Sequence, residues 1–278
     1  MAVVVSYNGR EATRRTILAL LGQVGHIHVV DNGSEADSLE ILDSLARENE
    51  ITIERLGKNC GVGHALNLGV AHAKKIGCSW LLTMDQDSTV DNGLVKAYQS
   101  ADLLDHRVAS LSPRISKKRS YADPECFDID SAITSGNLVR VGVFEKIGLY
   151  DEGFFIDCID FDFSLRLRRA GYRLLLVQNA KMQHQLGEPT YLPTYLTKFY
   201  ARHSSVRRYY MTRNYLYLTE RYLLRFPGFI IKLGILRILL FVLIFFLDRN
   251  PLASYCAIAR GLRDYVARRD GAYPGAPR

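Results

Sequence analysis

The beginning of the chain alternates between short apolar runs and longer amphipathic stretches, and this alternation most constrains the fold. The apolar runs, each the length of one strand, are Val3–Ser6, His26–Val30, Ile51–Arg55 and Trp80–Met84. The stretches with helical periodicity between them are Thr13–Leu21, Asp37–Glu48 and His64–Ile76. Strands that alternate with helices in this way form parallel βαβ units. We therefore predict an α/β fold with a mostly parallel, doubly wound sheet flanked by helices.

The composition is that of a folded protein in a reducing compartment. The chain has 278 residues, of which 48% are hydrophobic and 23% charged, so it can bury one large core or one core with an appendage. Its five cysteines are scattered and form no C-x-x-C pair, which argues against a disulfide framework and a thiolate zinc site. The amino terminus has no basic segment before its apolar run, so we read it as a strand and not as a signal peptide. We expect a cytoplasmic protein.

Two acidic clusters contain the candidate residues for metal binding and catalysis. Asp85-Gln86-Asp87 directly follows the predicted strand Trp80–Met84, so both carboxylates should emerge at the carboxyl end of a strand, where open α/β sheets bind ligands. A second cluster extends from Asp157 to Asp162. Mg²⁺ is held by one or two carboxylates together with substrate phosphate oxygens. The pattern indicates metal-assisted chemistry on a phosphorylated donor, although a solvated acidic turn has the same sequence.

Two other enzyme classes must be weighed. The stretch Asn59–His64 contains Gly61-Val62-Gly63, but a dinucleotide fingerprint needs Gly or Ala where Leu66 stands, and it belongs after the first strand. This turn before a helix can still favour a diphosphate. The residues from Asp85 to Thr89 also resemble the D-x-D-x-T loop of haloacid-dehalogenase phosphohydrolases, with Asp85 as nucleophile. That family carries the loop on its first strand, whereas here three strands precede it.

The carboxyl-terminal part is basic and contains a long apolar stretch. From Lys198 onward there are 15 Lys and Arg against 4 Asp and Glu, although the whole chain has a net charge of +7. Arginines interleaved with tyrosines suggest nucleic acid, but the neighbouring stretch Phe229–Leu247 is apolar except for Lys232 and Arg237, which points to lipid instead. A spanning helix needs roughly 20 apolar residues. We expect a segment that lies in the cytoplasmic leaflet with its arginines on anionic headgroups; a buried hairpin or a dimer interface is the alternative.

Seven motifs occur in order along nearly the whole chain. They are Val3-Val4-Val5-Ser6-Tyr7-Asn8, Val29-Val30-Asp31-Asn32-Gly33-Ser34, Asn59-x-Gly61-x-Gly63-x-x-x-Asn67-x-Gly69, Asp85-Gln86-Asp87-Ser88, Ser135-Gly136-Asn137, Phe154-Phe155-Ile156-Asp157-x-x-Asp160-x-Asp162-x-x-x-Arg166 and His184-x-x-Gly187. Together they resemble the GT-A-fold, family-2 glycosyltransferases. With Arg208-Tyr209-Tyr210-x-x-Arg213-Asn214, the chain looks most like the bacterial rhamnosyltransferases that build O-antigen and related surface polysaccharides.

The resemblance implies a role for each motif on the donor side. Asp31 accepts hydrogen bonds from the nucleotide base, and Asp85 and Asp87 hold Mg²⁺ or Mn²⁺ on the diphosphate, with His184 as a further ligand. The remaining residues expected at the nucleotide or the donor sugar are Ser6, Asn8, Asn59, Asn67, Ser135, Gly136 and Asn137. Arg208 and Arg213 are expected to clamp the diphosphate. An ordinary turn at Asp31 and packing or lipid contact of the arginines are the alternatives.

The resemblance also implies a catalytic residue in the second acidic cluster. Many relatives have Glu-Asp where this chain has Ile159-Asp160, and alignment on Asp162 and Arg166 makes Asp160 the base. Asp157 and Asp162 are expected to help, by orienting the base or by holding the start of a helix at Leu165–Arg169.

The resulting hypothesis is an inverting, metal-dependent transferase at the inner face of the cell membrane. It uses dTDP-L-rhamnose and a glycan acceptor on a polyprenyl diphosphate, with a homo-oligomer left open. A catalytic domain is expected over residues 1–190, with its nucleotide-sugar half at about 1–100, and a basic helical region over 191–278. The competing hypotheses are the phosphohydrolase and a membrane scaffold that binds nucleotide sugars without turnover.

Overall fold

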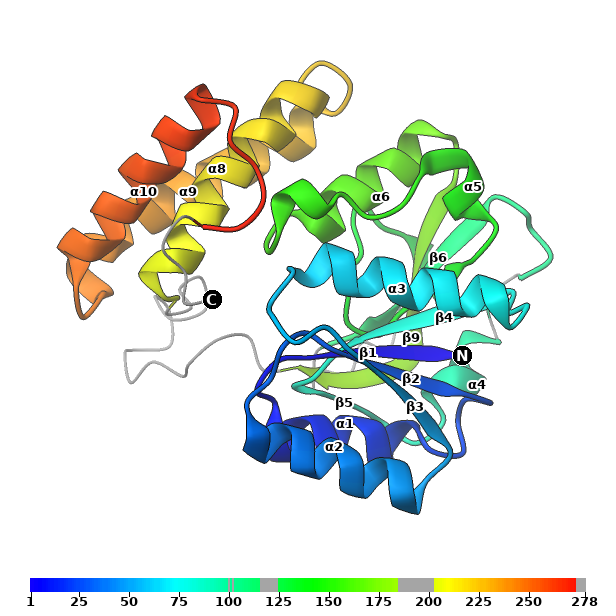
Figure 1. Cartoon of the computed structure of the whole chain (residues 1–278). Helices are drawn as coiled ribbons and strands as arrows, with labels where there is room; N and C mark the ends of the chain where they lie inside the picture. Colours follow the sequence, from blue (N-terminus) through cyan, green and yellow to red (C-terminus); the bar gives the residue numbers. More distant parts are fainter. Residues whose placement is uncertain (100, 102, 116–124, 185–202, 274–278) are drawn as a thin grey trace. The chain divides into compact units, whose positions relative to one another are not determined.

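The computed structural model describes residues 1–278 except 100, 102, 116–124, 185–202 and 274–278 (Figure 1). The chain forms two compact units. The first comprises Met1–Glu152 and Asp160–His184, and the second comprises Gly153–Ile159 and the described residues from 203 to 273. The expected boundary at residue 190, like Gly187 of the last motif, lies outside the described residues.

The first unit is built on a nine-stranded sheet with the order β3-β2-β1-β4-β8-β6-β9-β5, in which β7 pairs with β9. Its strands are β1 (Ala2–Ser6), β2 (Ile27–Asp31), β3 (Ile51–Arg55), β4 (Trp80–Asp85), β5 (Ser88–Val90), β6 (Val108–Arg114), β7 (Cys126–Asp128), β8 (Asn137–Arg140) and β9 (Arg173–His184). Its helices are α1 (Arg10–Leu20), α2 (Ala36–Glu48), α3 (Val62–Lys75), α4 (Leu94–Tyr98), α5 (Val143–Ile147), the 3₁₀ turn η1 (Glu152–Phe154, which ends in the second unit) and α6 (Ile159–Arg169).

The first four strands confirm the predicted parallel arrangement. β1 pairs in parallel with β2 and β4, and β2 pairs in parallel with β3. All five residues of β1 are buried, as expected for a central strand covered on both faces. Figure 1 shows α1 and α2 on one face of these strands and α3 on the other. Gly69 of α3 is required there, because a Cβ at this position would overlap the side chain of Val3.

The second half of the sheet is more mixed than the sequence predicts. β8 is antiparallel to both β4 and β6, and β9 is antiparallel to β5 and β7 but parallel to β6. The sheet is therefore a mixed α/β sheet, and its parallel character belongs to β1–β4. The predicted helix start at Leu165 is wrong: α6 begins at Ile159, so Asp160 and Asp162 lie in its first turn.

The second unit contains the helices α8 (Ser205–Tyr222), α9 (Pro227–Leu247) and α10 (Pro251–Val266). Local sequence sets their starts: the side chains of Ser204 and Asn250 accept hydrogen bonds from the backbone of the first turns of α8 and α10, and α9 and α10 each begin with proline. α8 and α10 approach closely at Gly261, where a Cβ would come within 2.7 Å of the Tyr209 carbonyl oxygen.

α9 is the one helix among the described residues that is long and apolar enough to cross a membrane. Only 17% of the most apolar 18-residue stretch of α9 is buried, so this helix is not part of a closed core. The exposed apolar side chains on it include Ile231, Ile235, Ile238, Phe241, Val242, Phe245 and Phe246.

Candidate active site

Three neighbouring parallel strands end at the same edge of the sheet and bring together residues from three motifs. Ser6 at the end of β1 is in register with Asp31 at the end of β2, and Val5 is in register with Asp85 at the end of β4. This edge is formed by the carboxyl ends of the strands, where open α/β sheets bind their ligands. The structure thus groups Ser6, Asp31 and Asp85, which are separated in the sequence.

Asp31 has one carboxylate oxygen engaged and one without a hydrogen-bond partner. Its Oδ2 accepts hydrogen bonds from the backbone N–H groups of Gly33 at 3.3 Å and Ser34 at 3.1 Å, which fixes the turn after β2. The side chain is 1% exposed, and its Oδ1 has no hydrogen-bond partner among the described residues. A buried acceptor without a donor is costly in a folded protein, so Oδ1 is a candidate acceptor for a donor that a ligand supplies.

The loops after β1 and β2 are tied to each other beside Asp31. The N–H of Asn8 donates to Ser34 Oγ at 2.8 Å, and the N–H of Glu35 donates to Asn8 Oδ1 at 2.7 Å. Asn8 has a left-handed backbone with φ of 54°, a conformation that Asn tolerates better than most residues. Ser6 Oγ lies 3.2 Å from Thr13 Oγ1 of α1. Asn8 and Ser6 therefore shape this edge of the sheet.

Gln86 holds the first acidic cluster in place. Its Oε1 accepts from the N–H of Tyr7 at 2.6 Å, and its Nε2 donates to the Tyr7 carbonyl oxygen at 3.0 Å. Thr16 Oγ1 lies 2.8 Å from the carbonyl oxygens of both Gln86 and Ser88. These contacts anchor the turn on both sides of Asp87, whose side chain is exposed, while Asp85 is half-buried.

His184 is brought to this turn by sheet pairing. β5 and β9 are antiparallel, and Ser88 is in register with His184 at the end of β9. The backbone of His184 therefore lies opposite the residue that follows Asp87. Carboxylate oxygens such as those of Asp85 and Asp87 suit Mg²⁺ or Mn²⁺. A metal ion at this turn, with His184 as a further ligand, stays a prediction.

The Ser135-Gly136-Asn137 motif supports the end of β4. Ser135 Oγ accepts a hydrogen bond from the N–H of Asp85 at 3.1 Å, and the N–H of Gly136 donates to the Thr83 carbonyl oxygen at 2.8 Å. Gly136 is needed because its φ is 75° and a Cβ would come within 2.6 Å of Pro113. Asn137 is buried, and its Oδ1 accepts from the hydroxyl of Ser110 at 2.7 Å.

Tyr98, the last residue of α4, also supports the end of β4 through Gly136. Its hydroxyl donates to the carbonyl oxygen of Gly136. Burial raises the pKa of Tyr98 well above its usual value, so the phenol stays protonated and keeps this bond. The motif is therefore built into the strand end that carries Asp85, and direct contact of its residues with a donor stays a prediction.

The two asparagines of the third motif make structural contacts. Asn59 Oδ1 accepts from Asn32 Nδ2 at 3.2 Å and from the N–H of Gly61 at 3.0 Å, which fixes the turn before α3. Asn67, buried in α3, exchanges hydrogen bonds of 2.9 and 3.0 Å with the backbone of Tyr150 and donates to Glu152 at 2.8 Å. Their predicted contact with the donor is not visible in these bonds and stays a prediction.

The two carboxylates in the first turn of α6, Asp160 and Asp162, differ in burial and in their hydrogen-bond partners. Asp162 is 1% exposed, and its Oδ2 accepts from Arg166 Nε at 2.8 Å. Arg166 also donates to the Ile147 carbonyl oxygen at 2.8 Å, so Asp162 anchors α6 to the end of α5. Asp160 is half-buried, and its Oδ1 accepts from the N–H of Phe161 at 2.9 Å. Asp160 is therefore the more accessible carboxylate of this turn.

Asp157 lies in the second unit, where an arginine and an asparagine hold its loop. Arg237 Nη2, from α9, donates to Asp157 Oδ1 at 3.0 Å and lies 3.9 Å from Cys158 Sγ. Asn214 Nδ2 of α8 lies within 3.0 Å of the carbonyl oxygens of Phe154, Ile156 and Asp157. We call these two side chains the loop brace.

The braced loop is conformationally strained. Phe155, Asp157 and Cys158 have φ angles of 63°, 68° and 65°, in the left-handed region that L-residues rarely adopt. Such outliers persist only where the surroundings hold them, and they cluster at functional sites. Arg237 is not among the predicted site residues, although a charge inside an apolar helix indicates a specific partner.

The predicted diphosphate clamps are engaged inside the second unit. Arg213 is fully buried and donates to the carbonyl oxygens of Gly271 at 2.8 Å and Gly153 at 2.9 Å. Arg208 is 2% exposed and lies 3.4 Å from Asp248. Burial lowers the pKa of the neighbouring His203 to about 4, and the positive charges of Arg207 and Arg208 add to this shift. These contacts show packing roles, and the clamp stays a prediction.

Comparisons of the sequence with known proteins find similarity to glycosyltransferases. Residues 1–126 match the family model described as Glycosyl transferase family 2. The chain is 27% identical over 235 residues to the dTDP-rhamnosyl transferase RfbF of Shigella flexneri, which is 77% of each chain. It is 24% identical over 257 residues to the galactofuranosyltransferase GlfT1 of Mycobacterium tuberculosis, which is 82% of each chain.

A solved structure extends the similarity to almost the full length. The mannosyltransferase PcManGT of Pyrobaculum calidifontis, in complex with GDP-Man and Mn²⁺, superposes with a TM-score of 0.61 at 15% identity. The match covers 96% of this chain and 74% of that one.

Proposed function

We propose a donor and an acceptor for this chain, which has the GT-A fold and is a family-2 glycosyltransferase resembling rhamnosyltransferases. In this proposal the protein transfers L-rhamnose from dTDP-L-rhamnose to a glycan acceptor in surface polysaccharide synthesis. The similarity to RfbF over 77% of each chain supports this choice of donor. The observation that carries the donor site is the buried Asp31 carboxylate, with one oxygen unpartnered among the described residues at the sheet edge that also bears Asp85.

Asp31 suits a pyrimidine base with an imide N–H. Thymine and uracil both present that N–H beside two carbonyl oxygens, and a carboxylate oxygen accepts it well. A charge-assisted hydrogen bond of this kind is stronger than one between neutral groups. The proposal therefore assigns base recognition to Oδ1 of Asp31, while its Oδ2 keeps the backbone turn at Gly33 and Ser34 in place.

Asp85 and Asp87, with His184 as a third candidate, would hold a divalent metal ion. A Mg²⁺ or Mn²⁺ ion bound there would offset the negative charge that develops on the departing nucleoside diphosphate. Gln86 and Thr16 fix the backbone of this turn, which keeps the two carboxylates in place. PcManGT carries Mn²⁺ with its GDP-Man, which supports the choice of ion.

Asp160 is proposed as the general base of an inverting transfer. An acceptor hydroxyl is a poor nucleophile until a positioned carboxylate takes its proton, and inversion requires attack from the face opposite the departing diphosphate. Asp162 anchors α6 through Arg166, and Asp157 is held by Arg237, so both are proposed to position the base and not to touch the proton.

The carboxyl-terminal helices are proposed to bring the enzyme to a lipid-linked acceptor. α9 exposes a large apolar surface, and the chain from Lys198 onward has an excess of basic residues. An apolar face together with basic residues gives the two signals that stable attachment to an anionic membrane needs. The proposed location is the inner face of the cell membrane, with the acceptor glycan on a polyprenyl diphosphate.

The test is acceptor-dependent release of nucleoside diphosphate. The purified full-length protein is incubated with Mg²⁺, a panel of nucleotide sugars and membrane lipid that carries the acceptor. Release of dTDP from dTDP-L-rhamnose only when acceptor lipid is present supports the proposal. Release from another donor corrects the sugar. Phosphate release from monoesters supports the phosphohydrolase, and binding without turnover supports the scaffold.

A further inference from the structure

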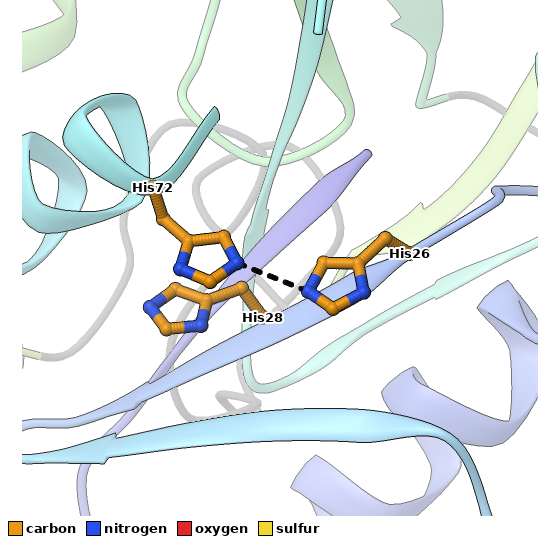
Figure 2. A group of neighbouring side chains, drawn as sticks. All are labelled: His26, His28 and His72. Carbon is orange, nitrogen blue, oxygen red and sulfur yellow. Dashed lines mark hydrogen bonds between the residues drawn. The ribbon is translucent and has the colours of Figure 1, made fainter. Parts of the chain in front are cut away.

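Three histidines gather at the end of the parallel strands opposite to the donor site. His26 directly precedes β2, His28 is the second residue of β2, and His72 lies in the last turn of α3 (Figure 2). One ligand atom from each lies within 4.8 Å of the others. None of the seven sequence motifs includes them.

The nitrogen atoms of this cluster already lie close together. His26 Nε2 is 3.1 Å from His72 Nε2, the contact drawn in Figure 2, and 3.0 Å from Thr52 Oγ1 of β3. His28 Nδ1 is 2.8 Å from the same hydroxyl. Two imidazole nitrogens, those of His26 and His28, therefore contact the Thr52 hydroxyl, and the third, of His72, contacts His26.

The carboxylate of Glu54 lies beside His28, the most buried of the three histidines. His28 is 3% exposed, and Glu54 Oε2 lies 3.4 Å from its Nε2. This Nε2 has no hydrogen-bond partner among the described residues. Histidines that ligate metals through one nitrogen regularly turn the other toward a carboxylate, which fixes the ring and raises its basicity. His28 has this arrangement if Nδ1 faces the ion.

We propose that His26, His28 and His72 form a binding site for a borderline divalent ion such as Zn²⁺. Zinc binds imidazole nitrogen at about 2.0–2.1 Å in tetrahedral geometry, which requires nitrogen atoms about 3.4 Å apart. The distance of 3.1 Å between His26 and His72 is close to this value. Thr52 or a solvent oxygen supplies the fourth position.

Ion binding requires one change in the cluster. The rings of His28 and His72 are stacked, with centroids 4.0 Å apart and planes at 10°, so their lone pairs do not converge on one point. The His72 ring must turn about its outer side-chain torsion, which has a broad energy profile, and its hydrogen bond with His26 is then replaced by binding of both nitrogens to the ion. His72 is half-buried at the end of a helix and can make this turn.

The site is distinct in place and in chemistry from the donor metal site. His28 and Asp31 are three positions apart along β2, which corresponds to about 10 Å along a strand. Imidazole ligands favour Zn²⁺, Cu²⁺ or Ni²⁺, whereas carboxylates and phosphates favour Mg²⁺ or Mn²⁺. Because its ligands come from β2 and α3, a bound ion would join the sheet to the helix and stabilise the first unit.

Calorimetric titration with ZnCl₂ tests this site. The full-length protein is first stripped with EDTA and dialysed, and it is titrated in the presence of excess Mg²⁺. We expect a site that Mg²⁺ does not block and a rise in the melting temperature on binding. His72→Gln and His28→Gln should each weaken it at least tenfold, and Glu54→Gln should weaken it less. His106→Gln, which changes an exposed histidine elsewhere, should have no effect.

Two results would overturn the proposal. The first is equal Zn²⁺ affinity in the native protein and in His72→Gln, the variant expected to fold even if the buried His28→Gln does not. The second is loss of the site in Asp87→Ala, which would show that zinc binds at the donor carboxylates. A site that Asp87→Ala keeps and His72→Gln loses supports the proposal. Neither result depends on transfer activity, so the proposed function is tested separately.

Discussion

Replacing Asp31 by Asn tests base recognition with little risk to the fold. The variant keeps an oxygen that can accept the backbone bonds from Gly33 and Ser34, but it puts an NH₂ group where Oδ1 stands. A donor would then face the imide N–H of thymine or uracil. A hydrogen bond to a charged group contributes about 1.5–3 kcal/mol, and 1.4 kcal/mol corresponds to a tenfold change in Kd, so Kd for dTDP or UDP should rise about 10- to 150-fold.

Calorimetric titration with dTDP, UDP and CDP measures this effect. Because cytosine presents an acceptor at the ring nitrogen where thymine presents N–H, Asp31→Asn should also reduce the preference for dTDP and UDP over CDP. The melting temperature should stay the same or rise, since the substitution removes a buried charge. Asp43→Asn, an exposed carboxylate paired with Arg55, is the matched control. Unchanged affinity and unchanged preference among the three nucleotides would refute the assignment of Asp31 to the base.

Four further sets of substitutions test the metal ligands, the base, the loop brace and α9. Asp87→Ala should lower both donor affinity and turnover, as EDTA should in the native enzyme; full activity in EDTA would contradict a metal at this turn. Asp160→Asn should cut transfer by roughly 10²–10⁴-fold with donor binding kept, whereas Asp162→Asn should mainly lower the melting temperature, and the reverse pattern would move the base. Arg237→Leu should destabilise the protein by about 3 kcal/mol, the lower end for a broken buried pair, because the side chains of Arg237 and Asp157 are 17% and 11% exposed. Adding Asp157→Asn should restore most of that loss in thermal unfolding; a double variant no more stable than Arg237→Leu would exclude the ion pair as its cause. Phe245→Gln with Phe246→Gln should move the protein from anionic vesicles to the supernatant in sedimentation, whereas Leu104→Gln, which changes an even more exposed apolar residue outside α9, should not. Equal sedimentation of the native protein, the double variant and Leu104→Gln would show that α9 does not bind lipid.

The sequence predicted the first half of the sheet because each buried parallel strand is an apolar run with its own turn signals. Ile51–Arg55 has the predicted bounds, β1 and β4 are each one residue longer at one end than predicted, and β2 is shifted by one residue at both ends. The second half could not be predicted in the same way. β5 has only three residues, and its partner β9 lies far along the chain, so the pairing of Ser88 with His184 depends on contacts that no local pattern encodes. The start of α6 was missed because its first turn is acidic and has no amphipathic period of its own.

The candidate site likewise contains some features that the sequence predicts and others that depend on long-range contacts. The motif residues of the strand ends, Asp31 and Asp85, are grouped by the parallel register that the alternation predicts. The contacts of Asn67 with Tyr150 and of Arg237 with Asp157 join residues 83 and 80 positions apart, and only the folded chain brings them together. Whether an asparagine or an arginine in a motif serves a ligand or the backbone is decided by such contacts.

The loop brace also has a consequence for the order in which the chain becomes competent during synthesis. Asp157 leaves the ribosome 80 residues before Arg237. At about 5–20 residues per second, the strained segment from Phe155 to Cys158 exists for roughly 4–16 s before that arginine has been made. The nascent chain can therefore complete its sheet while the acidic segment ahead of Asp160 still lacks one of its two supports. That support arrives on α9, the one helix among the described residues that is long and apolar enough to cross a membrane, so completion of the brace coincides with the appearance of the surface best suited to a bilayer.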